Sequence, residues 1–331
     1  MQTNAVVFAR AEDVEIRTIE MPPPGPGQVQ IRTHVSTISA GTEGWALRDL
    51  FTWAPTPFPC VPGYQRVGTI VAVGPDVADW QVGDRVMATN GQWEGPVAPF
   101  WGSHVACANT PVEQLFRIPS GAGDLDASTT VVAQVGYNAA SRAVIEPGDW
   151  VVVYGDGLIG QSAAQAIRAR GAKAILVGHR AERLALGAAH SADAAVNSHE
   201  QDVVAAVRSH TGSETVPVVL DTVQSENAQR QYVPLLETGR GQIVYSGFTP
   251  GKTWADMGLL QQRELTTHFV SGWTRERMDA TLGLMAEGKM SLRPLITHHV
   301  PYARGPEMYR MILEKSPSLL GATLDWEGAE A

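Results

Sequence analysis

The sequence predicts an α/β fold that combines a barrel-like β domain with a doubly wound parallel sheet. Up to about residue 125, short β-branched runs alternate with turn clusters, and no long helical pattern occurs. This pattern is typical of a compact β domain. From about residue 126, strand and helix patterns alternate, and such a βαβ series forms a parallel sheet with helices on both faces. The length of 331 residues suits two domains of this kind.

The individual elements follow from hydrophobic periodicity. In the first part, strands are expected at residues 5–8, 29–35, 67–73 and 85–88, with turns at 22–27, 55–62 and 83–84. The second part is expected to contain helix 127–145, strand 150–154, helix 159–170, strand 174–177, helices 180–189 and 202–210, strand 216–220, helix 225–236 and strand 242–245. Helix 274–287, strand 296–300, helix 305–314 and strand 321–324 complete the chain.

Composition and charge exclude several classes of protein. Lys and Arg total 25 against 34 Asp and Glu, which gives a net charge of −9, so phosphate backbones and anionic lipid would repel the chain. The two cysteines, Cys60 and Cys107, form neither a disulfide framework nor a zinc ribbon. No signal peptide and no apolar run of 18 residues is present. We therefore expect a cytoplasmic protein that binds neither nucleic acid nor membrane.

A glycine-rich segment follows the apolar strand at residues 150–154 and opens a helix. Residues 155–160 (GDGLIG) fit the pattern G-x-G-x-x-G, whose context in a βαβ unit is typical of the Rossmann dinucleotide-binding fold. Gly155 permits the tight turn, Gly157 lets the backbone approach a diphosphate, and Gly160 lets helix and strand pack closely. Leu158 and Ile159 begin the helix, whose N-terminal N–H groups can bind the diphosphate.

The end of the next strand indicates which coenzyme is bound. In NAD-binding proteins an acidic residue at this position binds the ribose 2′-hydroxyl, but here the residues are Gly178, His179 and Arg180. A small residue followed by cations leaves room for a 2′-phosphate and offers it charge-assisted hydrogen bonds. The sequence therefore predicts NADPH in preference to NADH. The alternative is that Arg180 is an ordinary solvated residue at a helix start.

The order of these elements resembles the medium-chain dehydrogenase/reductase superfamily. The supporting segments are residues 61–64 (VPGY), 82–86 (VGDRV), 146–149 (EPGD) and 294–297 (PLIT). The resemblance implies a GroES-like catalytic domain at 1–125, an inserted Rossmann NADP-binding domain at 126–273, and a return to the catalytic domain at 274–331. It also implies a homodimer joined through the edge of the coenzyme-domain sheet.

The zinc-binding segments of that superfamily are altered in this chain. Residues 40–43 (AGTE) replace a Cys-Gly-Thr-Asp segment, residues 63–65 (GYQ) replace Gly-His-Glu, and residues 88–101 contain no cysteine. Since zinc needs thiolate or imidazole ligands, the chain is identified as a zinc-independent member with no metal. Residues 39–43 and 62–64 are most similar to the bacteriochlorophyllide dehydrogenase branch, although Gln65 stands where that branch has glutamate.

Without zinc, another group must stabilise the charge that develops on a carbonyl oxygen. The first candidate is Tyr64, at the position of a zinc-ligand histidine, because a phenol is a proton donor at neutral pH. The alternative is that Tyr64 packs the domain interface, with its hydroxyl bonded to a backbone carbonyl. The resemblance places Thr42 near the nicotinamide ribose and Glu43 close beneath the site. Glu43 either relays a proton or accepts structural hydrogen bonds that tie down the loop.

Further residues are expected around the substrate and the nicotinamide. Gly247 and Phe248 follow strand 242–245 at the carboxyl edge of the sheet, where ligands bind in doubly wound folds. Tyr137 and Asn138 are additional polar candidates. Aromatic residues crowd the loops of the first domain and suggest a broad apolar pocket for a ring-bearing substrate; the alternative is that they build the domain core. The pocket candidates are Trp45, Trp53, Trp93 and Trp101.

Together these features predict a zinc-independent, NADPH-dependent oxidoreductase that transfers hydride between nicotinamide and a bulky, partly apolar alcohol or ketone. One alternative is reduction of a carbon–carbon double bond in an enone, or of a quinone, by a member of the same superfamily. A second alternative is an NADPH-binding protein without catalytic activity.

Overall fold

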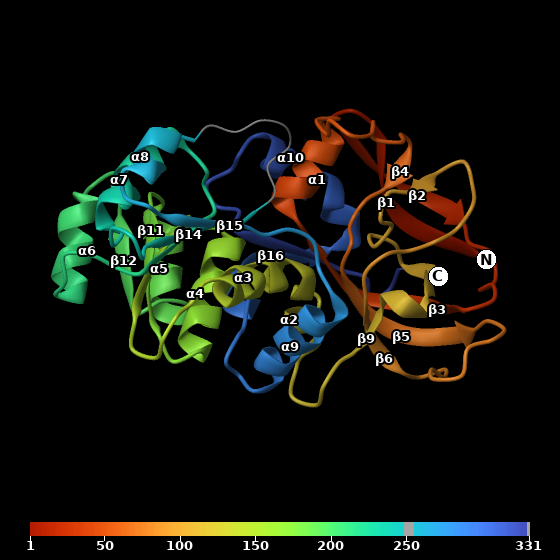
Figure 1. The fold of residues 1–331 in the computed structure, drawn as a ribbon. Coiled ribbons are helices and arrows are strands. Elements are labelled where there is room, and N and C mark those ends of the chain that lie inside the picture. Colours follow the sequence, from red (N-terminus) through yellow and green to blue (C-terminus); the bar gives the residue numbers. More distant parts are fainter. Residues whose placement is uncertain (248–254, 330–331) are drawn as a thin grey trace. The chain divides into compact units, whose positions relative to one another are not determined.

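The computed structural model describes residues 1–247 and 255–329. The chain divides into two compact units (Figure 1). The first contains Met1–Val131 and Ile296–Ala331, and the second contains Val132–Leu295. No described helix is both long enough and apolar enough to cross a bilayer.

The first unit is built on two β-sheets within its described residues. The smaller has the order β2-β1-β4-β7, from β1 (Gln2–Arg10), β2 (Asp13–Glu20), β4 (Cys60–Val61) and β7 (Ala98–Pro99). The larger has the order β16-β17-β3-β5-β6-β9, with β8 paired to β3. It contains β3 (Gln28–Ile38), β5 (Arg66–Val73), β6 (Arg85–Ala88), β8 (Cys107–Pro111), β9 (Leu115–Arg117), β16 (Ile296–Pro301) and β17 (Gly321–Asp325). Because β17 pairs antiparallel with β3, the end of the chain belongs to this unit.

Three helices of the first unit are α1 (Ala40–Leu47), α2 (Asp124–Ala127) and α10 (Gly305–Leu313). Helix α1 was not expected from the sequence, because Gly41 and Gly44 weaken a helical pattern. Its stability comes from packing: Ala46 and Leu47 join the buried cluster that contains Met308 of α10. A Cβ at Gly44 would lie 3.1 Å from Ile312 Cγ2, so this glycine lets the two helices approach closely.

The second unit contains a six-stranded parallel sheet with the order β12-β11-β10-β13-β14-β15. Its strands are β10 (Trp150–Tyr154), β11 (Lys173–Gly178), β12 (Ala194–Asn197), β13 (Val218–Asp221), β14 (Gln242–Tyr245) and β15 (Thr266–Phe269). Tyr154 pairs with Val177 on one side and Asp221 on the other, so the carboxyl ends of three strands are aligned. The strand order reverses between β10 and β13, which is where doubly wound sheets bind ligands.

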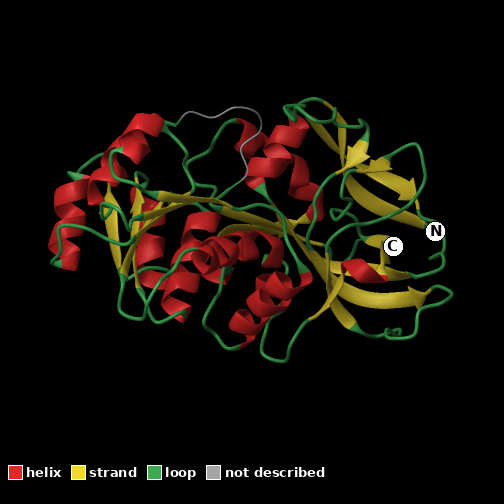
Figure 2. Ribbon diagram, in the orientation of Figure 1, coloured by secondary structure: helices red, strands yellow, loops and turns green. Residues whose placement is uncertain are grey.

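Helices flank this sheet (Figure 2). They are α3 (Thr130–Arg142), which begins at the end of the first unit, α4 (Leu158–Ala169), α5 (Ala181–His190), α6 (Val203–Thr211), α7 (Glu226–Tyr232), α8 (Met257–Gln261) and α9 (Arg275–Ala286). Alternate strand residues such as Val152 and Ile175 form a buried cluster with Val203 of α6 and Tyr232 of α7. The expected α/β fold, with a Rossmann-type parallel sheet, is confirmed.

The boundary of the returning segment differs from the expected residue 274. Helix α9 belongs to the second unit, and the first unit resumes at Ile296. Hydrogen bonds between Gln165 of α4 and the Ser291 backbone hold the segment that follows α9 to the second unit. Gln165 donates from Nε2 to the Ser291 carbonyl at 2.9 Å and accepts its N–H at 2.7 Å.

Candidate functional site

The glycine-rich turn between β10 and α4 has the geometry that its sequence predicts. Gly155 has φ +117°, and a Cβ there would lie 2.0 Å from Thr222 Oγ1. A Cβ at Gly160 would lie 1.9 Å from the carbonyl oxygen of Gly155, so helix and strand touch at this point. Gly157 is the N-cap of α4, and a Cβ there would meet no atom within 4 Å. The turn is therefore closed on its protein side and open at Gly157.

This opening fits the diphosphate of a dinucleotide. The first turn of α4, at Leu158 and Ile159, contains no acidic residue, and the N–H groups of a first helical turn have no partners within the helix. Gly247 lies beside this turn, because its Cβ would be 3.8 Å from Ile159 Cδ1. Phe248 lies outside the described residues.

A cluster of charged side chains lies where β11 ends. The Oδ2 atom of Asp156 accepts the backbone N–H groups of His179 and Arg180, both at 3.0 Å. Its Oδ1 atom lies 3.5 Å from Arg180 Nη1 and 3.6 Å from Arg183 Nη1. The sequence analysis identified Arg180 but missed Asp156 and Arg183. The available signals were the acidic residue inside the glycine motif and the spacing of three residues between Arg180, the N-cap of α5, and Arg183 in its first turn.

The His179 side chain stacks on another ring, whereas the neighbouring Arg180 side chain faces the Asp156 carboxylate. The His179 ring stacks on His199, with centroids 4.9 Å apart and planes inclined by 27°. Partial burial, followed by the charge of Arg180, lowers the pKa of His179, so its ring is neutral at pH 7. The positive charge at this strand end therefore comes from Arg180 and Arg183.

In the first unit, Tyr64 lies between β4 and β5, and its side chain contacts Ser39, the N-cap residue of α1. Its hydroxyl donates to Ser39 Oγ, and its ring meets the Trp101 ring edge-on, with centroids 5.4 Å apart. Burial and the nearby Glu43 carboxylate raise the pKa of Tyr64 to about 12, against smaller opposing effects from hydrogen bonds with Ser39 and Thr42. Tyr64 is therefore a neutral hydrogen-bond donor over the whole physiological range. The structure brings together Tyr64, Thr42 and Ser39.

Glu43 is fully buried beneath this group. Its Oε1 accepts the N–H of Ser39 at 2.8 Å, and its Oε2 accepts hydrogen bonds from His104 Nε2, at 2.9 Å, and from the Tyr309 hydroxyl. The donors of these three hydrogen bonds to the carboxylate are all groups of the protein. Glu43 is thus connected to Tyr64 through Ser39.

The hydrogen bonds continue behind His104. Trp326 Nε1 donates to Ser36 Oγ at 2.9 Å, and Ser36 Oγ lies 2.8 Å from His104 Nδ1. We assign the proton to Nε2 of His104, since this lets Ser36 donate to Nδ1 and Nε2 donate to Glu43. A Cβ at Gly63 would lie 2.5 Å from the His104 ring, and Gly63 has φ +87°. Glycine at 63 therefore allows Tyr64 to sit over this buried network.

Three of the four predicted tryptophans lie close to this group. Trp45 and Trp101 pack against the cluster that contains Phe51. Trp53 is 59% exposed, and the centroid of its ring lies 4.4 Å from that of the Phe51 ring. Phe100 stacks on Trp101 with centroids 4.3 Å apart. The result is an aromatic surface next to Tyr64.

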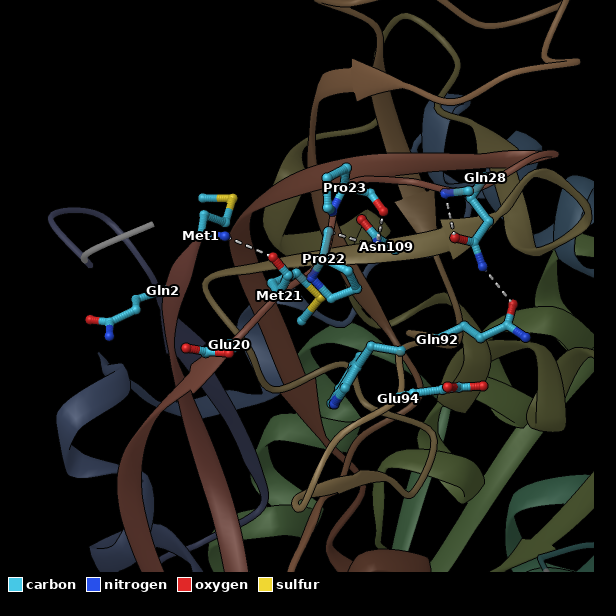
Figure 3. A pocket seen from close by; sticks show the side chains of 12 residues that line it. Met1, Gln2, Glu20, Met21, Pro22, Pro23, Gln28, Gln92, Glu94 and Asn109 are labelled. Carbon is cyan, nitrogen blue, oxygen red and sulfur yellow. Dashed lines mark hydrogen bonds between the residues drawn. The ribbon is translucent and has the colours of Figure 1, made fainter.

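Trp93 lies elsewhere in the first unit. It is buried in a separate cluster with Met21, and its Nε1 donates to the Val97 carbonyl at 2.9 Å. It lines a pocket of about 820 Å³, whose other lining groups largely hydrogen-bond one another, as Gln28 and Gln92 do (Figure 3). None of the catalytic candidates lines this pocket.

Tyr137 and Asn138 both lie on α3, in the second unit, where Asn138 is buried and Tyr137 partly buried.

The donor atoms around Tyr64 do not suit zinc. Ala40 has no ligand atom, and Gln65 is engaged: its Oε1 accepts the Val131 N–H at 3.0 Å and its Nε2 donates to the Thr37 carbonyl at 3.3 Å. Burial raises the pKa of the Cys60 thiol to about 12. Among residues 1–247 and 255–329, no three His, Cys, Asp or Glu side chains are grouped so that they could hold a metal ion.

Two family models match the chain. The model of the alcohol dehydrogenase GroES-like domain matches residues 25–120, and the model of the zinc-binding dehydrogenase matches residues 159–287.

Similar proteins cover nearly the whole chain. The 2-desacetyl-2-hydroxyethyl bacteriochlorophyllide A dehydrogenase of Cereibacter sphaeroides is 27% identical over 337 residues, covering 98% of this chain and 99% of the relative. The sorbitol dehydrogenase of Halalkalibacterium halodurans is 26% identical over 315 residues, covering 88% and 91%. The structure of benzyl alcohol dehydrogenase from Acinetobacter calcoaceticus has a TM-score of 0.84 at 21% identity, covering 98% and 99%. That of 2R,3R-butanediol dehydrogenase from Bacillus subtilis has a TM-score of 0.83 at 22% identity, with the same coverage.

Proposed function

Because the chain belongs to the medium-chain dehydrogenase/reductase superfamily, we propose that it is an NADPH-preferring, zinc-independent oxidoreductase. Its proposed substrate pair is a bulky, partly apolar alcohol and the corresponding ketone. The observation that carries this proposal is the glycine-rich turn, which is open at Gly157 and lies at the switch point of the parallel sheet. Bound NADPH supplies the hydride.

The second unit provides the groups that hold the coenzyme. Gly157 and the first turn of α4 bind the diphosphate through backbone N–H groups. At the end of β11, Gly178 is the proposed neighbour of the adenosine ribose and adds no side chain beside Asp156, and Arg180 pairs with the 2′-phosphate. His179 contributes its backbone and its stacked ring rather than a charge, since its pKa is lowered.

Tyr64 is the proposed proton donor to the substrate oxygen. Its pKa of about 12 keeps the hydroxyl protonated, and a preorganised donor of this kind stabilises negative charge that develops on oxygen. Because the single phenolic proton is donated to Ser39 Oγ in the structure, the O–H bond turns from Ser39 to the substrate oxygen in this scheme, while Glu43 holds Ser39 in place and Thr42 lies beside the hydroxyl. No step in this scheme requires a metal, which agrees with the poor zinc ligands at Ala40 and Gln65.

The aromatic surface beside Tyr64 supports a ring-bearing substrate. Trp101 contacts Tyr64 directly, and Trp53 is exposed next to Phe51. The name of the Cereibacter sphaeroides relative gives a bacteriochlorophyllide as its substrate, which is consistent with stacking on such a surface.

We further propose a homodimer formed through β15. This strand is at the edge of the sheet, and an uncovered edge strand tends to pair with another chain. Phe269 on β15 is 75% exposed and lines an apolar pocket of about 360 Å³ with Met257 and Leu260. A second copy of the chain would cover these apolar groups.

Product analysis distinguishes the reaction types. With NADPH and a cyclic aromatic enone, we expect the allylic alcohol, because the proposed role of Tyr64 is to protonate an oxygen. The saturated ketone would instead identify reduction of the carbon–carbon double bond. Saturable NADPH binding without NADPH oxidation across carbonyl, enone and quinone substrates would indicate a binding protein and contradict the proposed activity.

Replacing Arg180 by alanine tests the coenzyme preference. We expect the Kd for NADPH to rise about tenfold or more, since one charge-assisted hydrogen bond to phosphate is lost, and the Kd for NADH to change little. Fluorescence titration of each coenzyme measures both values. The control is Arg208→Ala on α6, which removes an exposed arginine paired with Glu214 and should leave both affinities unchanged. Equal losses for the two coenzymes in Arg180→Ala would contradict the 2′-phosphate assignment.

A further inference from the structure

Asp156, between the first two glycines of the turn, reaches across to the next strand. Asp156 is 4% exposed, and its Oδ2 atom accepts hydrogen bonds from the N–H groups of both His179 and Arg180 at 3.0 Å. The carboxylate therefore fixes the backbone where β11 ends and α5 begins. Charge-assisted hydrogen bonds of this kind are stronger than neutral ones.

The other carboxylate oxygen faces two guanidinium groups. Arg180 Nη1 and Arg183 Nη1 lie 3.5 and 3.6 Å from Oδ1, and the two side chains are 34% and 16% exposed. One carboxylate thus gathers two cations at the N-terminus of α5, where the helix dipole adds positive charge. Burial and the charge of Arg180 lower the pKa of Arg183. The group retains an excess of positive charge that favours a further anion.

Asp156 also explains the small residue at the strand end. A Cβ at Gly178 would lie 2.6 Å from both Cβ and Oδ2 of Asp156. The Asp156 carboxylate occupies the space that a side chain at position 178 would need. An acidic residue at position 178 and Asp156 therefore cannot both be accommodated. Position 156 is therefore coupled to the position that distinguishes NAD from NADP in this fold.

We infer that Asp156 is a specificity-determining positioning residue, which holds Arg180 and Arg183 together to receive the 2′-phosphate of NADPH. This inference rests on the proposed function and deepens it. An acceptor role toward the ribose 2′-hydroxyl of NADH is disfavoured, because Oδ2 is engaged by two N–H groups and Oδ1 faces two guanidiniums. The charge that remains for a ligand is positive.

Binding of coenzyme fragments tests the inference without any activity measurement. Calorimetry compares adenosine 2′,5′-bisphosphate with 5′-AMP on the wild-type protein and on Asp156→Asn. We expect the variant to bind the bisphosphate about tenfold more weakly and 5′-AMP almost unchanged. The control is Asp202→Asn, which alters the N-cap carboxylate of α6 and should change neither affinity.

The sign of the effect is decisive. If Asp156 were only a neighbouring anion, its neutralisation would leave two uncompensated arginines and strengthen binding of the bisphosphate. Equal or tighter binding in Asp156→Asn therefore overturns the inference while the proposed function stands. Wild-type protein that binds neither NADPH nor NADH overturns the proposed function itself, and the inference with it.

A relocation variant gives a second, independent readout. Asp156→Gly combined with Gly178→Asp moves the carboxylate to the strand end and removes the steric conflict between the two positions. We expect the ratio of Kd values for NADPH and NADH to reverse in favour of NADH. A double variant that folds and keeps the preference of the wild type would overturn the coupling between positions 156 and 178.

Discussion

Replacing Tyr64 by phenylalanine is expected to lower the turnover number about 100-fold, the usual contribution of a positioned proton donor. Affinity for NADPH should change little, because Tyr64 lies in the first unit and the glycines proposed to bind the coenzyme lie in the second. The substitution removes only the hydroxyl, so the edge-on contact between the ring and Trp101 can persist. Steady-state kinetics and coenzyme titration on the same preparation measure the two quantities.

The alternative role of Tyr64 is purely structural, with its hydroxyl bonded to Ser39. Tyr302→Phe is the matched control, since the Tyr302 hydroxyl accepts a hydrogen bond from Asn4 Nδ2 in the same unit and should be dispensable for turnover. Near-normal turnover in Tyr64→Phe would remove this residue from the chemistry. Because the pKa of Tyr64 is about 12, its ionisation should not limit activity between pH 7 and about 10.

Replacing Glu43 by alanine is expected to lower the free energy of unfolding by about 3–5 kcal/mol. The buried carboxylate accepts hydrogen bonds from the Ser39 N–H, His104 Nε2 and the Tyr309 hydroxyl. Alanine leaves these three donors without an acceptor and opens a cavity in the core. Denaturant unfolding of the variant and the wild type measures the loss.

Two further variants separate this effect from a general loss of charge. Glu43→Gln keeps one acceptor oxygen, but its amide NH2 group would face other hydrogen-bond donors. The stability of this variant should therefore fall between those of the wild type and Glu43→Ala. Glu307→Gln, on the exposed face of α10 and paired with Arg304, should have little effect. If Glu43→Ala were as stable as Glu307→Gln, Glu43 would have no anchoring role.

Local patterns in the sequence correctly predicted the strand and the helix on either side of the glycine-rich turn. The strand at 150–154, the glycines and the following helix are contiguous, and the structure contains them as β10, the turn and α4. The side chains that organise the turn were harder to predict. Asp156 lies within the motif, but it contacts Arg180 only because β11 pairs with β10 in the sheet.

The environment of Tyr64 depends on contacts between distant parts of the chain. Glu43 is separated from His104 by 61 residues and from Tyr309 by 266, and no local periodicity indicates such pairs. Helix α1 was missed because its glycines oppose helix formation, whereas its packing against α10 favours it. The aromatic residues fall into two separate groups, because residues that are distant in the sequence decide what each ring contacts. Trp93 accordingly packs with Met21.

Binding of the reduced coenzyme is the most direct test of this account. Isothermal titration calorimetry of the purified protein should show one saturable NADPH site per chain, with NADH bound more weakly. In Gly160→Val, whose side chain would meet the Gly155 carbonyl, the heat of binding should disappear while the protein remains folded by circular dichroism. Absence of saturable heat with both NADPH and NADH in the wild-type protein would contradict the account.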